Sequence, residues 1–354
     1  MRMNDLGEKE FLAKMLPGLN PHRSFVNRFG DDAAVLDIPL GESQRVVFKI
    51  DRAAQPTATR RGWADNSMWG RLAVTATCSD ILAAGAIPKA LMLACILPGD
   101  FEASQAFAIV EGCANECAEH DVAFVGGDTK EGPSPEIVSS GIGVTLNESY
   151  LGRQGASPGD AVVVAGQLGG YLGSYLQLIE LADAAPARRD QWVHYITHPR
   201  AQWEAALAMI RSGAPVAAMD CSDGLYDALS VLSGPYGCEI DEATLPYHPL
   251  AVECGHSLGL NLLSLALGVG DWNIVYVVPQ SRLDQLSSEL SSRGTLLTVV
   301  GVISDGESSA GHVQVRDEHG RSHRLRPVVN EHFVTRQEDE GTFLEKIAMS
   351  PYVE

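Results

Sequence analysis

The stretch Phe29-Gly30-Asp31-Asp32-Ala33-Ala34-Val35-Leu36 places two adjacent carboxylates between a glycine and an apolar run. The run from Ala33 to Ile38 predicts a strand, and neighbouring residues in a strand face opposite sides. A glycine at this point lets the backbone approach a ligand closely, or adopts a φ that other residues avoid. Asp31 and Asp32 are therefore expected to point into different surroundings.

Short motifs that contain an aspartate recur along the chain, each at the end of an apolar or β-branched run or just after it. Any one of them alone is read most simply as an aspartate that caps a helix or closes a turn. Five together, with no basic run beside them, favour carboxylates that hold divalent cations bridging to phosphates. Besides the opening stretch, the motifs are Lys49-Ile50-Asp51, Cys78-Ser79-Asp80, Gly126-Gly127-Asp128-Thr129 and Asp220-Cys221-Ser222-Asp223-Gly224-Leu225.

Composition and charge exclude some classes of binding partner. The chain has 354 residues, of which 45% are hydrophobic, and a formal net charge of −19. An acidic chain lacks the basic surface that nucleic acid or an anionic membrane requires, so neither is expected as a partner. Seven cysteines without a Cys-x-x-Cys pair, no secretory leader and no apolar run of membrane-spanning length together predict free thiols in the cytoplasm.

The length predicts two domains of ordinary size. The turn-rich run Gly152-Arg153-Gln154-Gly155-Ala156-Ser157-Pro158-Gly159-Asp160 marks the expected boundary. We expect one domain over residues 1–150, a second over 151–336, and a tail over 337–354 that docks on a neighbouring segment. Residues 53–66 predict a functional loop, 122–125 a strand that runs into Gly126, and 184–191 an exposed polar segment.

In order and spacing these motifs resemble those of thiamine-monophosphate kinase, a family of the aminoimidazole ribonucleotide synthetase and selenophosphate synthetase superfamily. The likeness covers roughly residues 5–305 and includes Cys78-Ser79-Asp80-Ile81-Leu82-Ala83-Ala84-Gly85-Ala86-Ile87-Pro88. It implies an α/β (α+β) fold in which the N-terminal domain binds ATP and metal and forms a sheet or barrel across a homodimer. It also implies a layered α/β C-terminal domain, ATP and Mg²⁺ as cofactors, and a small-molecule acceptor.

Carried over residue by residue, the resemblance implies a role for each matching position. Asp128 and Asp32 would be the catalytic residues. Asp31 also fits the motif, with its role left open. The implied magnesium ligands are Asp32, Asp51, Asp80, Asp128, Asp220 and Asp223, and the implied ATP contacts are Gly127, Arg153 and Ser222.

The sequence departs from the family pattern on the acceptor side. Lys49 and Ile50 replace a Ser-Thr pair, so that an ammonium either replaces one cation or points to solvent. Gly270 stands where the family has a glutamate that meets the thiamine part, and the loop after Asp51 adds positive charge. We therefore predict a kinase whose acceptor is not thiamine monophosphate and bears a carboxylate or phosphate. The arginines of that loop are Arg52, Arg60 and Arg61.

Two other functions remain open. One is ATP-dependent activation of an amide, carboxylate or guanidine by phosphorylation, and the other is a catalytically idle nucleotide-binding scaffold.

Overall fold

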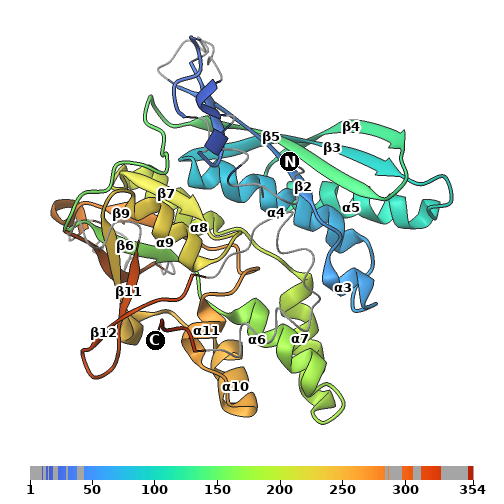
Figure 1. The fold of residues 1–354 in the computed structure, drawn as a ribbon. Coiled ribbons are helices and arrows are strands. Elements are labelled where there is room, and N and C mark those ends of the chain that lie inside the picture. Colours follow the sequence, from blue (N-terminus) through green and yellow to red (C-terminus); the bar gives the residue numbers. More distant parts are fainter. Residues whose placement is uncertain are drawn as a thin grey trace.

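The computed structural model describes residues 10, 13–14, 16–18, 23–28, 31–37, 44–283, 286, 297–305, 312–327 and 350–353. Within these residues the chain forms a five-stranded sheet from residues 34–145 and a seven-stranded sheet from residues 161–324 (Figure 1). The predicted two-domain α/β fold is confirmed. Among the described residues we find no helix both long enough and apolar enough to cross a membrane.

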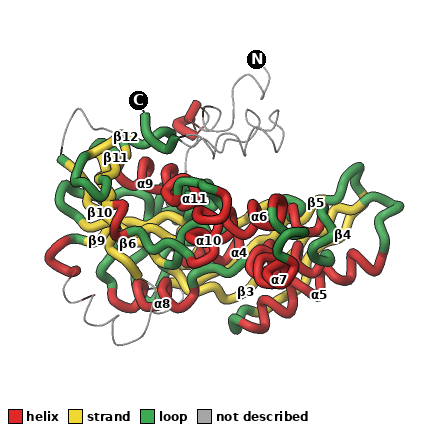
Figure 2. The backbone as a smooth tube through the Cα atoms, turned by 90° about the horizontal axis from the view of Figure 1, so that it is seen from below, coloured by secondary structure: helices red, strands yellow, loops and turns green. Residues whose placement is uncertain are grey.

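The first sheet has the strand order β1-β2-β5-β3-β4. Its pairs are antiparallel except for β3 and β4, which run parallel. Its helices α4 and α5 pack on one face (Figure 2), and in Figure 1 no described α-helix lies over the other face. The elements are β1 (Ala34–Leu36), β2 (Val46–Ala53), α3 (Thr57–Arg60), α4 (Ser67–Ala83), β3 (Ala86–Leu97), α5 (Ala103–Glu119), β4 (Ala123–Glu131) and β5 (Glu136–Thr145), with a 3₁₀ turn at Leu16–Gly18.

Helix α4 is the central element because it touches both sheets. Trp69, Ala73 and Val74 pack against the strands of the first sheet, whereas Leu82 and Ala83 join the core of the second. A helix that is apolar on all sides is expected to be buried in this way. Asp80, near the end of α4, therefore lies in the interior, between the two sheets.

The second sheet has the order β12-β11-β8-β10-β6-β9-β7. Strands β6 and β9 are buried along their whole length, since α9 covers one face and α8 covers the other. The elements are β6 (Ala161–Ala165), α6 (Gly170–Glu180), α7 (Pro186–Thr197), α8 (Trp203–Ser212), β7 (Ala217–Asp220), α9 (Leu225–Ser233), β8 (Gly237–Asp241), a 3₁₀ turn at Glu242–Thr244, α10 (Pro249–Leu258), α11 (Leu262–Ala266), β9 (Ile274–Val278), β10 (Leu297–Ser304), β11 (Val313–Arg316) and β12 (Ser322–Arg324).

Two local predictions are corrected and one is confirmed. The expected loop 53–66 contains the one-turn helix α3. The segment 184–191 is exposed as predicted, and it also starts α7, where Pro186 takes the first helical position that tolerates proline. The glycine pair at 126–127 lies inside β4 instead of following it. A Cβ on Gly127 would lie 1.7 Å from the carbonyl oxygen of Leu93, so the close strand pairing requires glycine there. Most of the predicted tail, residues 337–349, lies outside the described residues, whereas Tyr352 pairs with Leu325.

Candidate active site

Three buried aspartates from separate elements meet between the two sheets. Asp32 precedes β1, Asp80 lies in the last turn of α4, and Asp220 ends β7. One carboxylate oxygen of each lies within 4.8 Å of the others, and the three residues are 6%, 5% and 2% exposed. We call these three residues the aspartate cluster.

Asp31 and Asp32 face opposite sides, as expected of neighbouring residues, and have different partners. The carboxylate of Asp31 accepts hydrogen bonds from the side-chain amide of Asn27 at 3.0 Å and from the backbone N–H groups of Arg28 and Arg153, each at 3.1 Å. Asp31 therefore fastens two loops together. This leaves Asp32 to face the cluster.

Asp220 is presented by a sharp turn between β7 and α9. Gly224 closes the turn with a φ of +97°, which favours glycine, and a Cβ there would lie 2.9 Å from the carbonyl oxygen of Leu267. Within the turn the hydroxyl of Ser222 donates to Asp220 Oδ1 at 3.1 Å. Asp220 Oδ2 is buried, and no group of the described residues forms a hydrogen bond with it.

Two cationic side chains reach the aspartate cluster. The ammonium of Lys49 lies 2.7 Å from Asp80 Oδ2 and 3.8 Å from Asp51 Oδ2. The guanidinium of Arg153 pairs with Asp32, and its Nε donates to Asp32 Oδ1 at 3.2 Å. Burial alone lowers the pKa of Lys49, but the charges of Asp80 and Asp51 outweigh it and hold that pKa above the ordinary value.

These two cations do not fully offset the buried negative charge. Burial raises the pKa of all three clustered carboxyls, and for Asp220 burial and the charge of Asp32 raise the pKa to about 7. Carboxylates held together in this way are stabilised by a divalent cation, which prefers oxygen ligands. The unpartnered Asp220 Oδ2 offers such a ligand, so the cluster fits Mg²⁺.

Other residues expected at the site lie at different distances from the cluster. Asp51 is a neighbour through Lys49, and Asp223 lies in the turn that follows Asp220. Ser222 contacts Asp220 directly. Arg153, expected to contact ATP, binds Asp32 in this structure.

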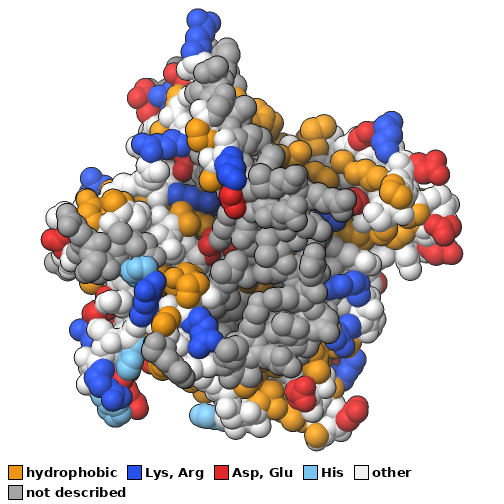
Figure 3. Space-filling view, in the orientation of Figure 1, with side chains coloured by type: hydrophobic (Ala, Val, Ile, Leu, Met, Phe, Trp, Pro, Cys, Tyr) orange, Lys and Arg blue, Asp and Glu red, His pale blue; other side chains and the backbone are white. Residues whose placement is uncertain are grey.

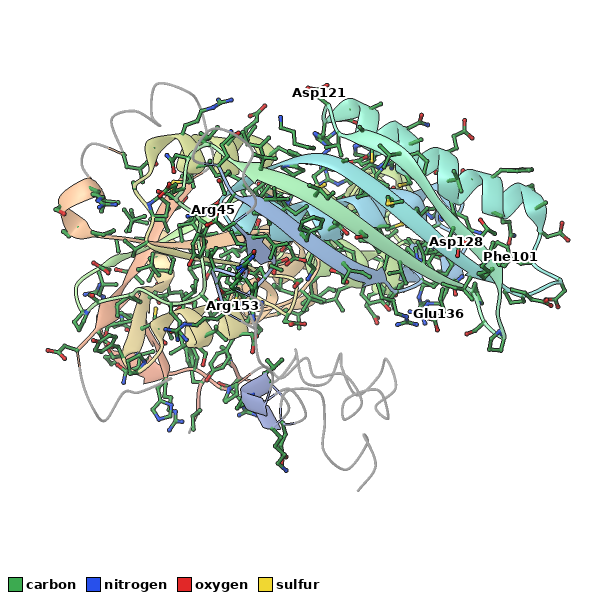
Figure 4. The ribbon with its side chains drawn as sticks, turned by 90° about the horizontal axis from the view of Figure 1, so that it is seen from above. Arg45, Phe101, Asp121, Asp128, Glu136 and Arg153 are labelled. Atoms are coloured by element: carbon green, nitrogen blue, oxygen red, sulfur yellow. The ribbon has the colours of Figure 1, made fainter. Side chains whose placement is uncertain are left out.

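Asp128 is not brought to the cluster within one chain. Its side chain is 64% exposed and lies 3.5 Å from the ammonium of Lys130. Figure 4 shows Asp128 toward one end of the first sheet, near Phe101 and Glu136, and well away from Arg153. The reason is topological: Asp128 and Gly127 lie on β4, the edge strand, whereas Asp51 lies on β2 across the sheet. A ligand role for Asp128 stays a prediction.

A cavity of about 610 Å³ opens beside the end of the second sheet at which Asp220 lies. Asp271, which lines the cavity, comes three residues before Ile274, the strand partner of Asp220. The cavity wall is rich in imidazole and aromatic rings. Its ring-bearing residues are His120, His194, Tyr195, His198, Trp203 and His248, accompanied by Gln202, Arg200 and Glu204.

Asp271 is a buried carboxylate held by donors. It accepts hydrogen bonds from the N–H groups of Gly169 at 2.6 Å and Tyr171 at 2.7 Å, and from the hydroxyl of Tyr195 at 3.2 Å. Burial raises its pKa to about 6, although these donors oppose the rise. The ring of Tyr195 lies against His248, with their centroids 4.4 Å apart.

Gly270 is fixed by its neighbour on α6. It adopts a φ of +101°, and a Cβ there would lie 2.5 Å from the ring of Tyr171. A side chain at position 270 would therefore require Tyr171 to move. The ring of Tyr171 takes the space directly next to this glycine.

The predicted contribution of three loop arginines to the acceptor side stays a prediction. None of them is among the residues that line the cavity, where Arg200 is the arginine present. Arg52 pairs with Glu136 on the first sheet, Arg60 donates to Thr57, and Arg61 lies over the ring of Trp63 at 5.4 Å.

Sequence reasoning singled out Gly270 but missed the ring-bearing residues of the cavity. His194 lies in the last turn of α7 and His198 is its C-cap residue, with ring centroids 4.1 Å apart, so their four-residue spacing was the available signal. His248 and Asp271 come from distant segments, and no local pattern joins them to α7.

The chain is similar to known proteins in both sequence and fold. Residues 30–146 match the family model of the AIR synthase related protein, N-terminal domain. The thiamine-monophosphate kinase of Methanospirillum hungatei is 27% identical over 282 residues, which are 78% of this chain and 89% of the relative.

Two solved structures share the fold. The structure of AaThiL complexed with AMPPCP and TMP has a TM-score of 0.76 at 23% identity, covering 94% of this chain and 99% of that one. The hydrogenase maturation protein HypE in complex with ATP has a TM-score of 0.62 at 21% identity, covering 94% of this chain and 95% of that one. The chain therefore contains an AIR synthase related N-terminal domain, and over most of its length it is similar to thiamine-monophosphate kinases.

Proposed function

We propose that this protein is a Mg²⁺-dependent phosphotransferase that uses ATP and resembles thiamine-monophosphate kinase. The observation that carries the proposal is the aspartate cluster, in which Asp220 Oδ2 is buried without a hydrogen-bond partner in the part of the chain that the structure describes. The kinase name of the M. hungatei relative supports the reaction class. The complexes of AaThiL with AMPPCP and of HypE with ATP support ATP as the phosphoryl donor.

Separate residues would bind Mg²⁺ and ATP. Asp32, Asp80 and Asp220 would hold Mg²⁺, which when bound offsets the negative charge that spreads over the phosphate oxygens. Asp51 and Asp223 are candidate ligands at the rim of the cluster. Further contacts proposed for ATP are Arg153, Ser222 and Gly127, the last of which lies beside Asp128 on β4.

We further propose a homodimer formed through the first sheet. The face opposite α4 and α5 carries exposed apolar side chains, and Figure 3 shows hydrophobic atoms gathered over these strands. Ile50 and Met92, which are 68% and 49% exposed, flank Ser140 of the middle strand. By register Asp128 lies beside Ala94 and thus on the same side as Val138, so pairing through this face would bring Asp128 next to a second copy.

For the acceptor we propose a molecule other than thiamine monophosphate, bound in the 610 Å³ cavity. Gly270 cannot supply a counter-charge to a cationic thiazolium, and Tyr171 leaves no room for a longer side chain there. The imidazole rings and Arg200 suit an acceptor that carries a carboxylate or phosphate. The loss of one counter-charge in a partly desolvated pocket costs on the order of a hundredfold in rate or affinity.

The remaining features of the proposal concern organisation. We propose domains over residues 1–150 and 151–336, a boundary that falls between the last strand of the first sheet and the first strand of the second. We also propose a cytoplasmic location. The seven cysteines are free thiols and all are buried, which fits a reducing compartment.

The test is ADP formation from MgATP by the full chain, with and without candidate acceptors, with ³¹P NMR to identify the product. We expect ADP release with carboxylate- or phosphate-bearing acceptors, and a kcat/KM for thiamine monophosphate below about 10⁴ M⁻¹s⁻¹. A higher value would make the protein an ordinary thiamine-monophosphate kinase. AMPPCP binding with no ADP formed from any acceptor would instead support an idle nucleotide-binding scaffold.

A further inference from the structure

Lys49 places an ammonium inside the group of carboxylates instead of in solvent. Its side chain is 22% exposed, and its nitrogen lies 2.7 Å from Asp80 Oδ2 and 3.8 Å from Asp51 Oδ2. The position follows from the register of β2, in which Lys49 and Asp51 share one face and Lys49 lies opposite Gly141. The missing side chain at Gly141 leaves room for Thr77 and Ile81 of α4 to approach that face.

We propose that the ammonium of Lys49 occupies a cation subsite of the aspartate cluster, so that this chain binds one divalent cation fewer than it would with a hydroxyl residue at position 49. The inference rests on the proposed Mg²⁺ site. The proposal specifies how many divalent cations the site binds and which carboxylate oxygens coordinate them.

The charges of the site support one divalent ion. When ionised, the carboxylates of Asp51 and the three clustered aspartates carry four negative charges, and Lys49 with Arg153 carries two positive ones. Asp223, at the rim of the cluster, is left outside this balance. Two negative charges remain, which is the charge that a single divalent cation offsets. Without the ammonium, three negative charges would remain, and one divalent ion would leave the site negative.

The hydrogen bonds also show which oxygens remain for that ion. Lys49 covers Asp80 Oδ2, Arg153 covers Asp32 Oδ1, and Ser222 covers Asp220 Oδ1. Asp220 Oδ2 has no partner among the described residues. We therefore place the divalent ion on the Asp220 side of the cluster and the ammonium on the Asp80 side.

An ammonium differs from a metal ion in what it can do at that subsite. It is a compact single charge with three hydrogen-bond donors, so it can hold carboxylates and donate to a phosphate oxygen. It cannot gather six oxygen ligands, as Mg²⁺ does. Chelation removes Mg²⁺ but leaves the ammonium in place.

The test is Mn²⁺ binding to the nucleotide-free full chain, with free Mn²⁺ counted by electron paramagnetic resonance. We expect one tight Mn²⁺ per wild-type chain and two per Lys49→Ser chain. Lys49→Met, which removes the charge without adding an oxygen, should bind one Mn²⁺ at least tenfold more tightly than wild type. Lys89→Met, at an exposed lysine of β3, is the matched control and should behave as wild type.

The outcomes separate this inference from the proposed function. The same count and affinity in wild type and Lys49→Ser would overturn the subsite for Lys49 and leave the Mg²⁺ site intact. Weaker Mn²⁺ binding in both Lys49 variants would show that the ammonium supports the metal and does not replace one. No Mn²⁺ on any variant would overturn the metal site itself. Circular dichroism and the Mn²⁺-induced rise in Tm, expected to be larger for Lys49→Ser than for wild type, show whether each variant is folded.

Discussion

Replacing Asp220 with asparagine removes one buried negative charge while it keeps the shape of the side chain. In the metal-free chain, burial and the charge of Asp32 raise the pKa of Asp220 from 3.8 to about 7. Because the folded-state pKa lies above the unfolded value, the ionised carboxylate opposes folding above pH about 7. This opposition fades as the pH falls toward 3.8. A rise of this size corresponds to about 4 kcal/mol of folding free energy.

We therefore expect Asp220→Asn to raise the free energy of unfolding in EDTA at pH 8. The gain should be about 2–4 kcal/mol, with the lower figure allowing for the cost of burying an amide. The gain should shrink at pH 5, where the wild-type carboxyl is mostly protonated in the folded state. With saturating MgCl₂ the order should reverse, because Mg²⁺ stabilises only the chain that binds it.

The assay is guanidinium denaturation of both proteins at pH 8 and pH 5, in EDTA and in MgCl₂. Asp160→Asn is the matched control, since Asp160 is buried outside the cluster and accepts the N–H of Ser157 at 2.8 Å. The control should gain no stability in EDTA and should keep the response to Mg²⁺. The reasoning is refuted if Asp220→Asn is less stable than wild type in EDTA at pH 8, or if Mg²⁺ stabilises both proteins equally.

Three further predictions concern other parts of the molecule. Asp128→Asn should keep the fold, since its side chain is exposed, and should lower ADP formation by orders of magnitude; an unchanged rate would remove Asp128 from the site. Met92→Glu should convert the proposed dimer into a 37.9 kDa monomer in sedimentation, because it places a charge on the apolar sheet face, and a persisting dimer would exclude that face. Tyr195→Phe should lower the free energy of unfolding by about 1–2 kcal/mol at pH 8, because it removes a donor from buried Asp271; equal stability in a denaturation titration would contradict that role.

The sequence predicts well those features that depend on local pattern. The apolar run at residues 217–220 is a strand, and the glycine that follows it closes the turn that presents Asp220. The buried position of Asp80 follows from the small and mostly apolar residues around it on α4. Alternation along a strand also explains why Asp31 and Asp32 have different partners.

Features that depend on distant segments are not visible in the sequence. Asp51 and Asp128 occupy similar motifs, yet one lies on β2 and the other on the edge strand, and only the sheet order separates them. The ion pair between Lys49 and Asp80 likewise depends on how β2 packs on α4. The start of α7 was missed because its charged residues resemble those of an exposed loop, although the helix buries Trp192.

The most direct test of the central claim is the binding of AMPPCP, because it needs no knowledge of the acceptor. Isothermal titration calorimetry would compare wild type with Asp220→Asn, each with and without Mg²⁺. If the aspartate cluster holds the metal that anchors the phosphates, wild type binds AMPPCP only when Mg²⁺ is present, and Asp220→Asn binds at least a hundredfold more weakly. Binding that is independent of Mg²⁺, or equal in the two proteins, would contradict the assignment of the cluster as the nucleotide-metal site.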